Sequence, residues 1–243
     1  MNAIEIQSLR KTYKAVTAVD DLTLDIRQGE LLALLGVNGA GKTTTIKMLS
    51  CLTKPDSGDA LVLGHSITKE PARVKAVLGV SPQETAIAPN LTVRENLEFM
   101  AGIHGMTKGQ CQTTADEMIG TLGLGAVEKR KAKTLSGGWQ RRLSIALALV
   151  SRPRILFLDE PTLGLDVLAR RELWRVIENL KGRVTVILTT HYMEEAEALA
   201  DRIAVMAKGS LCAVGTAEEL LAQTGGKNLE DAFVLLVEGG AAQ

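Results

Sequence analysis

An apolar run that stops at a glycine-rich loop constrains this sequence more than any other feature. Residues 31–35 are all apolar without alternation, which is typical of a strand buried on both faces of a parallel sheet. The next residues, 36–43, match the pattern G-x-x-x-x-G-K-[ST], and we expect 44–49 to continue as a helix. The glycines let the backbone curl so that N–H groups face inward, and the helix adds the positive end of its dipole. The sequence therefore predicts a phosphate-binding loop at this turn.

Each residue of the loop is a candidate ligand of a nucleotide phosphate. The set is Gly36, Val37, Asn38, Gly39, Ala40, Gly41, Lys42, Thr43 and Thr44. Lys42 is expected to reach the β- and γ-phosphates, and the Thr43 hydroxyl is expected to ligate Mg²⁺. The alternative is a glycine-rich turn with a solvated lysine. The flanking strand and helix favour the phosphate loop over this alternative.

An acidic pair follows a second apolar run. Residues 155–158 are apolar, and a strand there delivers Asp159 and Glu160 to its carboxyl end, where open α/β sheets bind ligands. Asp159 is expected to hold the Mg²⁺ shell, and Glu160 is then free to accept a proton from an attacking water. The alternative is a polar strand terminus without function. The phosphate loop upstream argues against that alternative.

Strands and helices alternate along the chain, which indicates an α/β fold with a mainly parallel central sheet. Residues 4–6 and 22–26 alternate apolar and polar side chains, as half-buried antiparallel strands do. Residues 184–188 are rich in β-branched side chains, which indicates a further buried strand. Residues 92–149 contain many helix formers and no convincing strand. We therefore expect a helical subdomain inserted between strands of the sheet.

The expected organisation is a single domain with an insertion and a tail. The core comprises 1–91 and 151–221, the helical subdomain 92–150 and the C-terminal tail 222–243, together making one domain over 1–243. Lys208-Gly209, between two apolar runs, predicts a hairpin turn. The tail after Thr224 ends in Gly239-Gly240 and is expected to fray.

Composition excludes several classes of protein. Lys+Arg and Asp+Glu both number 28 and aromatic residues make up 3%, so no nucleic-acid partner is expected. The cysteines Cys51, Cys111 and Cys212 lie far apart, without metal-ligand spacing, and are expected to be reduced thiols of a cytoplasmic protein. No apolar stretch approaches the roughly 20 residues that cross a bilayer. Any role at a membrane is thus expected to depend on a partner.

Three further motifs follow in an order that points to a family. A Leu-Ser-Gly-Gly sequence at 135–138 opens an apolar helix, Gln83 lies in Ser-Pro-Gln-Glu, and His191 follows a strand that ends in two threonines. Together with the phosphate loop and the acidic pair, they resemble the nucleotide-binding subunits of ATP-binding cassette (ABC) transporters. The resemblance covers the chain from about Ile4 to Leu221. It implies a P-loop NTPase core with a mainly parallel sheet, an antiparallel β edge subdomain and the inserted helical subdomain.

The resemblance also implies the roles of individual residues. Tyr13 matches the aromatic residue that stacks on the adenine of ATP, and His191 matches the switch histidine near the γ-phosphate. Gln83 matches the glutamine that touches Mg²⁺ and senses the transmembrane partner. The implied catalytic residues are Glu160, His191 and Lys42, and the implied Mg²⁺ ligands are Thr43, Gln83 and Asp159. Asp166 matches the loop that links two active sites.

The signature loop, formed by Ser136, Gly137 and Gly138, implies a second ATP-binding chain. Ser136 is a good N-cap residue and the two glycines allow close backbone approach, so this helix N-terminus can bind an anion. Because the chain already has one phosphate loop, a second anion site makes sense if it completes the site of another copy. The resemblance implies a head-to-tail dimer, of identical or different chains, that encloses two ATP molecules. Trp139 departs from the family, which usually has Gln there.

Further segments resemble the type-2 export branch of the family. They are Pro-Asn-Leu-Thr-Val-Arg-Glu-Asn-Leu at 89–97, Thr-His-Tyr-Met-Glu-Glu-Ala-Glu at 190–197 and Asn-Leu-Glu-Asp-Ala-Phe at 228–233. The expected function is to energise an exporter by hydrolysing ATP, with the chain held on the inner face of the plasma membrane by a transmembrane permease subunit. The alternative is a soluble cassette ATPase that acts on ribosomes or DNA. A single phosphate loop and the absence of sustained heptads favour transport.

Overall fold

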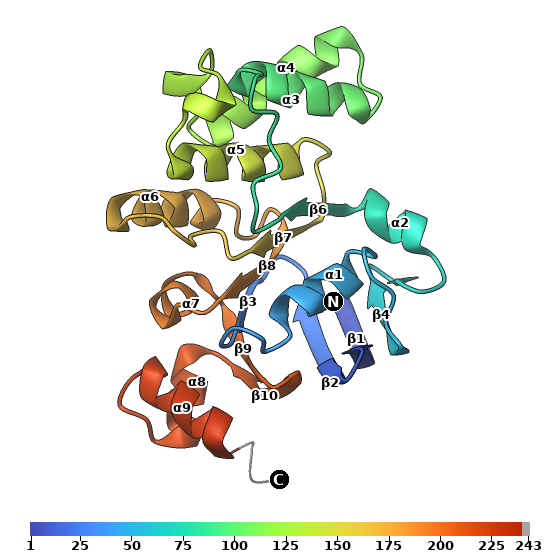
Figure 1. Cartoon of the computed structure of the whole chain (residues 1–243), viewed down its shortest axis with the longest axis vertical. Coiled ribbons are helices and arrows are strands. Elements are labelled where there is room, and N and C mark those ends of the chain that lie inside the picture. The colour runs from blue at the N-terminus through green and yellow to red at the C-terminus, as the bar shows by residue number, and fades with distance from the viewer. Residues whose placement is uncertain (240–243) are drawn as a thin grey trace.

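A computed structural model describes residues 1–239 and contains two sheets surrounded by helices (Figure 1). The larger sheet has six strands in the order β10-β9-β3-β8-β7-β6, and every neighbouring pair except β10-β9 is parallel. Its strands are β3 (Leu31–Leu35), β6 (Leu78–Ser81), β7 (Ile155–Asp159), β8 (Thr185–Thr190), β9 (Arg202–Ala207) and β10 (Ser210–Gly215). All side chains of β3, β7 and β8 are buried, as the unbroken apolar runs predict.

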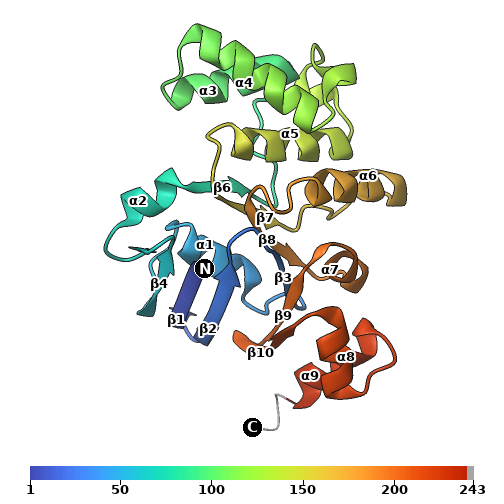
Figure 2. The same ribbon diagram turned by 180° about the vertical axis from the view of Figure 1, so that it is seen from behind.

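The smaller sheet is antiparallel and forms the edge of the molecule. Its order is β2-β1-β4-β5, with strands β1 (Asn2–Tyr13), β2 (Val16–Arg27), β4 (Ser57–Val62) and β5 (His65–Ser66). Helix α1 (Lys42–Leu49) lies between the two sheets, and the short helix α2 (Pro71–Ala76) leads into β6 (Figures 1 and 2). Ile46 of α1 packs in one buried cluster with Ile6 of β1 and Phe157 of β7. The antiparallel strands are thus attached to the parallel sheet through α1.

The opposite face of the larger sheet is covered by a second group of helices. Leu156 and Leu158 of β7 point to this side and pack with Leu173 and Ile177, whereas Phe157 points to α1. The helices concerned are α5 (Gly137–Leu149), α6 (Val167–Glu178) and α7 (Met193–Leu199). The expectation that residues after Asp166 form a helix with Leu173 and Ile177 on its buried face is confirmed.

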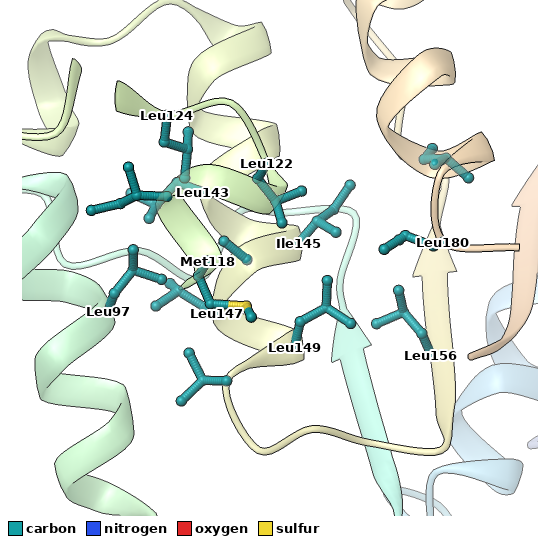
Figure 3. Packing of buried hydrophobic residues seen from close by; sticks show 14 of the residues in the cluster. Leu97, Met118, Leu122, Leu124, Leu143, Ile145, Leu147, Leu149, Leu156 and Leu180 are labelled. Carbon is teal, nitrogen blue, oxygen red and sulfur yellow. The ribbon is translucent and has the colours of Figure 1, made fainter. Parts of the chain in front are cut away.

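Helices α3 (Val93–Ile103) and α4 (Lys108–Thr121) continue the layer away from the sheet, with short 3₁₀ turns at Gly125–Val127 and Ala132–Thr134. Both helices begin with a capping box, Thr92 with Glu95 and Thr107 with Gln110. Side chains from α3, α4, α5 and β7 meet in one apolar cluster (Figure 3). The whole insertion lies between β6 and β7, so the predicted fold class is confirmed: a mainly parallel sheet, an antiparallel edge and an inserted helical subdomain.

The predicted hairpin turn joins β9 to β10. Lys208 and Gly209 have φ values of 49° and 87°, the left-handed conformation that a two-residue hairpin turn of this kind requires. Gly209 donates from its N–H to the carbonyl of Ala40 at 3.1 Å and accepts from the N–H of Asp20 at 2.9 Å. The turn therefore connects the phosphate loop to β2.

The expectation of a fraying tail after Thr224 is wrong as far as Gly239. Helix α8 (Ala217–Thr224) is followed by helix α9 (Leu229–Gly239), and Leu229 and Phe233 of α9 are buried against β9. The spacing of these two residues by four is the helical period, and their burial holds the segment on the sheet. Gly240 lies outside the described residues. Within residues 1–239, no helix has both the length and the apolar character needed to cross a membrane.

Candidate functional site

The glycine-rich loop runs directly from β3 into α1, as its sequence predicts. A Cβ on Gly36 would lie 2.5 Å from the carbonyl oxygen of Met206, so no larger residue fits there. Gly41 has a φ of 103° and occupies the N-cap position of α1, where no side chain caps the helix among the described residues. The first turn of α1 thus offers its N–H groups and the positive end of its dipole to an anion.

A cavity of about 510 Å³ opens beside this loop. It gathers segments that lie far apart in the sequence: the phosphate loop, the second residue after β6, the first residue after β7 and the first residue after β8. The predicted site residues that line it are Asn38, Gly39, Ala40, Gly41, Lys42, Thr43, Thr44, Gln83, Glu160 and His191. A second cavity of about 570 Å³, near Arg183 and Glu117, contains none of the predicted residues.

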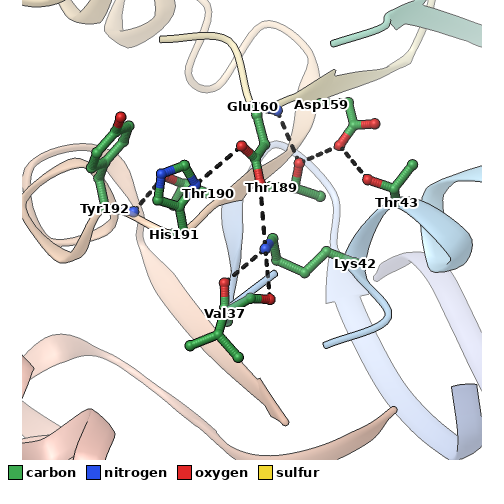
Figure 4. Close-up of polar contacts among 10 residues, drawn as sticks. Val37, Lys42, Thr43, Asp159, Glu160, Thr189, Thr190, His191 and Tyr192 are labelled. Carbon is green, nitrogen blue, oxygen red and sulfur yellow. Dashed lines mark hydrogen bonds and ion pairs between the residues drawn. The ribbon is translucent and has the colours of Figure 1, made fainter. Parts of the chain in front are cut away.

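Glu160 lies between a lysine and a histidine (Figure 4). Nζ of Lys42 is 3.4 Å from Oε1 of Glu160, and both side chains are almost fully buried. Nδ1 of His191 is 3.0 Å from Oε2 of Glu160, although the two groups are not aligned for a hydrogen bond. Lys42 also donates to the carbonyl oxygen of Gly36 at 2.7 Å. The carboxylate that the sequence assigns to proton transfer therefore faces the lysine that it assigns to phosphate binding.

Thr189 contacts both residues of the acidic pair, Asp159 at its carboxylate and Glu160 at its backbone N–H. Its hydroxyl donates to Oδ1 of Asp159 at 2.6 Å and accepts from the backbone N–H of Glu160 at 3.0 Å. The hydroxyl of Thr43 donates to the same Oδ1 at 3.1 Å. From the sequence alone, Thr189 is predicted only to be part of the end of a strand. Its polar side chain at the carboxyl end of a buried strand is the signal that could have revealed it.

The backbone at Glu160 is held in an uncommon conformation. Its φ is 46°, in the left-handed region that residues with a Cβ rarely adopt. Such a conformation persists only where neighbouring contacts fix it, and it occurs often at active sites. Here the N–H of Glu160 is fixed by both the hydroxyl and the carbonyl oxygen of Thr189. The turn after β7 thus directs the Glu160 side chain into the cavity.

The oxygen donors next to the loop fit Mg²⁺. The hydroxyl of Thr43 and the carboxylate of Asp159 are in direct contact, and both are the hard oxygen ligands that this ion prefers. Residues 1–239 contain no cluster of three or more His, Cys, Asp or Glu side chains suited to a metal. Mg²⁺ does not need one, because it commonly takes one or two protein ligands together with substrate phosphates and water.

Other predicted residues lie outside the cavity. Tyr13 is 44% exposed at the end of β1, opposite Val16 in the β1-β2 register, and Val16 does line the cavity. Asp166 caps α6 by accepting from the N–H of Ala169 at 2.9 Å. Three further residues do not line the cavity but are hydrogen-bonded to residues that do. Lys42 donates to the carbonyl oxygens of Gly36 and Val37, and Thr43 donates to Asp159.

The signature residues begin α5, and they are separate from the chain's own cavity. Ser136 has the backbone conformation of an N-cap residue, but its side chain makes no capping hydrogen bond. Ser136 and Gly137 are exposed. Trp139, at the position that departs from the family, lies 4.8 Å from the guanidinium of Arg142, which pairs with Glu172 of α6 at 2.6 Å. The unusual tryptophan is therefore accommodated by stacking against its own helix.

Glu195 is a buried acid behind the site. It is 0% exposed, accepts a hydrogen bond from Nε1 of Trp174 at 3.0 Å, and its second oxygen has no hydrogen-bond partner among the described residues. Burial raises the pKa of Glu195, and hydrogen bonding at the carboxyl group and the charge of Arg170 oppose this rise only in part. The sequence motifs assign no role to Glu195.

The chain is similar to known proteins over most of its length. Residues 19–163 match the ABC transporter family. The chain is 40% identical to the linearmycin resistance ATP-binding protein LnrL of Bacillus subtilis (strain 168), over 93% of this chain and 73% of that protein. It is 44% identical to the daunorubicin/doxorubicin resistance ATP-binding protein DrrA of Streptomyces peucetius, over 92% of this chain and 68% of that protein.

The fold is also similar to that of a solved structure. It is a dimeric ATP-binding cassette in a post-hydrolysis state, bound to ADP and Pi, with a TM-score of 0.79, 26% identity, and coverage of 88% of this chain and 98% of that one. The fold and the site thus define a P-loop ATPase. The chain belongs to the ABC transporter family as one of its ATP-binding subunits, and its relatives include drug-resistance ATP-binding proteins.

Proposed function

We propose that this chain energises an exporter by hydrolysing ATP with Mg²⁺ in the cavity beside α1. The observation that carries the proposal is the position of Glu160, between Lys42 and His191 at the mouth of a phosphate loop. A nucleoside triphosphate needs N–H donors and a lysine for its phosphates, and a carboxylate for the attacking water. These groups line one cavity of suitable volume.

The proposed mechanism assigns one task to each residue. The loop N–H groups and Lys42 bind the β- and γ-phosphates, and Glu160 accepts the proton of the attacking water. His191, beside Glu160, orients the γ-phosphate and the water. Thr43, Asp159 and Gln83 would hold Mg²⁺, which when bound neutralises charge on the phosphate oxygens. Tyr13, at the rim of the cavity, is proposed to stack on adenine.

Two chains are proposed to enclose two ATP molecules. The exposure of Ser136 and Gly137 supports this proposal, because an anion-binding helix start that is remote from its own cavity can serve a second chain. The dimeric cassette structure described above supports the same arrangement. Asp166, which caps α6 close to α5, is proposed to link the two sites. The second chain is another copy or a related cassette chain.

A transmembrane permease is the proposed partner, with this chain bound to its inner face. The relatives named for resistance to linearmycin and to daunorubicin/doxorubicin support export over action on ribosomes or DNA. We also propose that 92–150 acts as the helical subdomain between the core segments 1–91 and 151–221, and that 222–243 forms the C-terminal tail.

Inside-out membrane vesicles provide the test. Vesicles would carry this chain together with a candidate permease, sought as a membrane protein encoded by a neighbouring gene, and ATP-driven uptake of a fluorescent anthracycline would be measured. The expected result is uptake that depends on ATP and is lost in the matched Glu160→Gln vesicles. If membranes do not stimulate hydrolysis but ribosomes or DNA do, the transport proposal is wrong and the alternative class stands.

A further inference from the structure

Arg141 of α5 is bound to the main chain of the segment that carries Gln83. Its Nη1 donates to the carbonyl oxygen of Pro82 at 2.6 Å, and its Nη2 donates to the carbonyl oxygen of Gln83 at 2.6 Å. The side chain is only 5% exposed. A guanidinium has a rigid, planar fork of donors, so it can hold two consecutive carbonyl groups in one fixed arrangement.

Burying the charge of Arg141 in this way lowers the stability of the fold, so a functional role for the arrangement is expected. No carboxylate of the described residues lies within ion-pair distance of Arg141. Burial lowers the pKa of Arg141, and only the more distant charges of Asp159 and Glu195 compensate. A buried charge without a paired carboxylate is unusual unless its hydrogen bonds position something.

Two further contacts on the same face of α5 bind the helix to β6. The hydroxyl of Ser144 lies 2.9 Å from the hydroxyl of Ser81, and both residues are buried. A Cβ on Gly79 would overlap the carbonyl oxygen of Ala148, so helix and strand are in direct backbone contact. Positions 141, 144 and 148 share one helical face. The helix that begins at the signature loop is therefore attached along β6 up to Gln83.

We infer that Arg141 is a positioning residue: it fixes the backbone at Gln83 so that the amide side chain lies in the phosphate cavity, and it ties Gln83 to the start of α5. The inference rests on the proposed function for the role of Gln83. Contact between the signature loop and the nucleotide of a second chain would shift the start of α5, one turn before Arg141. Because Arg141 is hydrogen-bonded to the backbone of Gln83, the same shift would move Gln83 of that chain.

The first experiment does not depend on activity. Hydrogen exchange would be measured on peptides covering 81–86 in the parent chain and in the Arg141→Gln, Arg141→Lys and Arg152→Gln variants. Arg152 is the matched control, because it is 65% exposed and paired with Glu117 beyond the end of α5. Exchange at 81–86 is expected to rise in both Arg141 variants and to stay at the parent level in Arg152→Gln. Exchange at the phosphate loop should not change.

The second experiment asks whether Arg141 acts through Gln83. Hydrolysis, nucleotide affinity and the Mg²⁺ concentration for half-maximal rate would be measured for Arg141→Gln, Gln83→Ala and the double variant. For Arg141→Gln we expect a rate lower by about tenfold, a higher Mg²⁺ requirement and nucleotide affinity within about twofold of the parent. The double variant should be no slower than Gln83→Ala, because two residues that act as one unit are not additive.

Two outcomes would overturn the inference. One is parent-level exchange at 81–86 in Arg141→Gln, and the other is a double variant whose rate loss is the product of the two single losses. Arg141→Lys keeps the charge and is the control for misfolding of Arg141→Gln. It should unfold at the thermal midpoint of the parent and still show the raised exchange at 81–86. If Glu160→Gln hydrolysed ATP at the parent rate, the proposed function would fail, whereas the exchange result would still decide the role of Arg141.

Discussion

Nζ of Lys42 lies 3.4 Å from Oε1 of Glu160, with 5% and 9% of the two side chains exposed. The lysine proposed to bind phosphate and the proposed general base therefore balance each other's charge as an almost fully buried pair. Removing either charge leaves the other one buried and unpaired. Each single substitution should thus be measured for stability as well as for activity.

Glu160→Gln should bind ATP and hydrolyse it at least about a hundredfold more slowly, because the amide cannot accept the proton of the attacking water. Phosphate release measures the rate, and equilibrium titration measures binding. Glu197→Gln is the control, since Glu197 is exposed on α7. Hydrolysis by Glu160→Gln at the parent rate would remove Glu160 from the role of base.

Lys42→Ala should lower nucleotide affinity at least about tenfold, the loss expected for one charge-assisted hydrogen bond to phosphate. A fluorescent ATP analogue titrated into each chain measures this loss. Lys47→Ala is the matched control, because Lys47 lies on the same helix and is exposed. Equal affinity in Lys42→Ala and the parent would contradict the assignment of the loop.

Gly137→Asp should abolish pairing of two mutant copies. An aspartate there would face the phosphates of the second chain's nucleotide, and like charges about 4 Å apart in a partly buried site repel by about 4 kcal/mol. The fold tolerates the side chain, since a Cβ on Gly137 meets only Leu165, at an ordinary contact distance of 3.4 Å. Light scattering measures dimer formation with ATP.

A mixture of Gly137→Asp with Lys42→Ala should recover part of the hydrolysis rate. One composite site is then intact, built from the phosphate loop of the first chain and the signature loop of the second. The control replaces the second chain by one that carries both substitutions, which leaves no intact site. Equal phosphate release from the mixture and from this control would contradict the shared-site arrangement.

Glu195→Gln should reduce the dependence of stability on pH. Because burial raises the pKa of Glu195, the folded state disfavours its ionised form. Its contribution to stability is therefore fully present below the pKa of an unfolded glutamate and is lost as pH rises through the folded value. Urea unfolding between about pH 4.5 and about pH 8 should show the Gln variant gaining stability over the parent towards high pH. Glu197→Gln should follow the parent at every pH.

Two glycine substitutions should have opposite effects on stability. Gly79→Ala should destabilise the fold, because its Cβ would overlap the backbone of Ala148 in α5. Gly120→Ala, within α4, meets nothing within 4 Å and should stabilise by about 0.5–1 kcal/mol through helix propensity. Thermal unfolding of both variants measures the difference, and a stabilised Gly79→Ala would contradict the close packing of α5 on β6.

The sequence predicts those parts of the site that depend on neighbouring residues. Residues 31–35 and the loop after them form a strand and a phosphate loop because apolar pattern, glycine spacing and helix start all act locally. The role of Thr189 is different, since it depends on the parallel pairing of β7 with β8, which sets Thr189 opposite Asp159. A single sequence does not reveal which residues of two strands lie opposite each other, so this contact could not be predicted.

Arg141 and α9 were missed for related reasons. An arginine inside an amphipathic pattern is normally solvated, and only the packing of α5 on β6 places Arg141 against Gln83. In the tail, Gly239-Gly240 led to the prediction of fraying, although Leu229 and Phe233 have helical spacing. Their burial against β9 depends on tertiary contacts that the local pattern does not reveal.

The turn at Lys208-Gly209 has a practical consequence for engineering. A two-residue hairpin turn is usually a good place to insert an epitope tag or to open new termini. Here Gly209 is bonded to Ala40 in the phosphate loop and to Asp20 in β2, and the Cβ position of Gly36 is closed by Met206 at the end of the preceding strand. An insertion at this turn would therefore shift the backbone of the phosphate loop at Ala40, and a tag placed there should inactivate the enzyme although none of its own atoms enters the cavity.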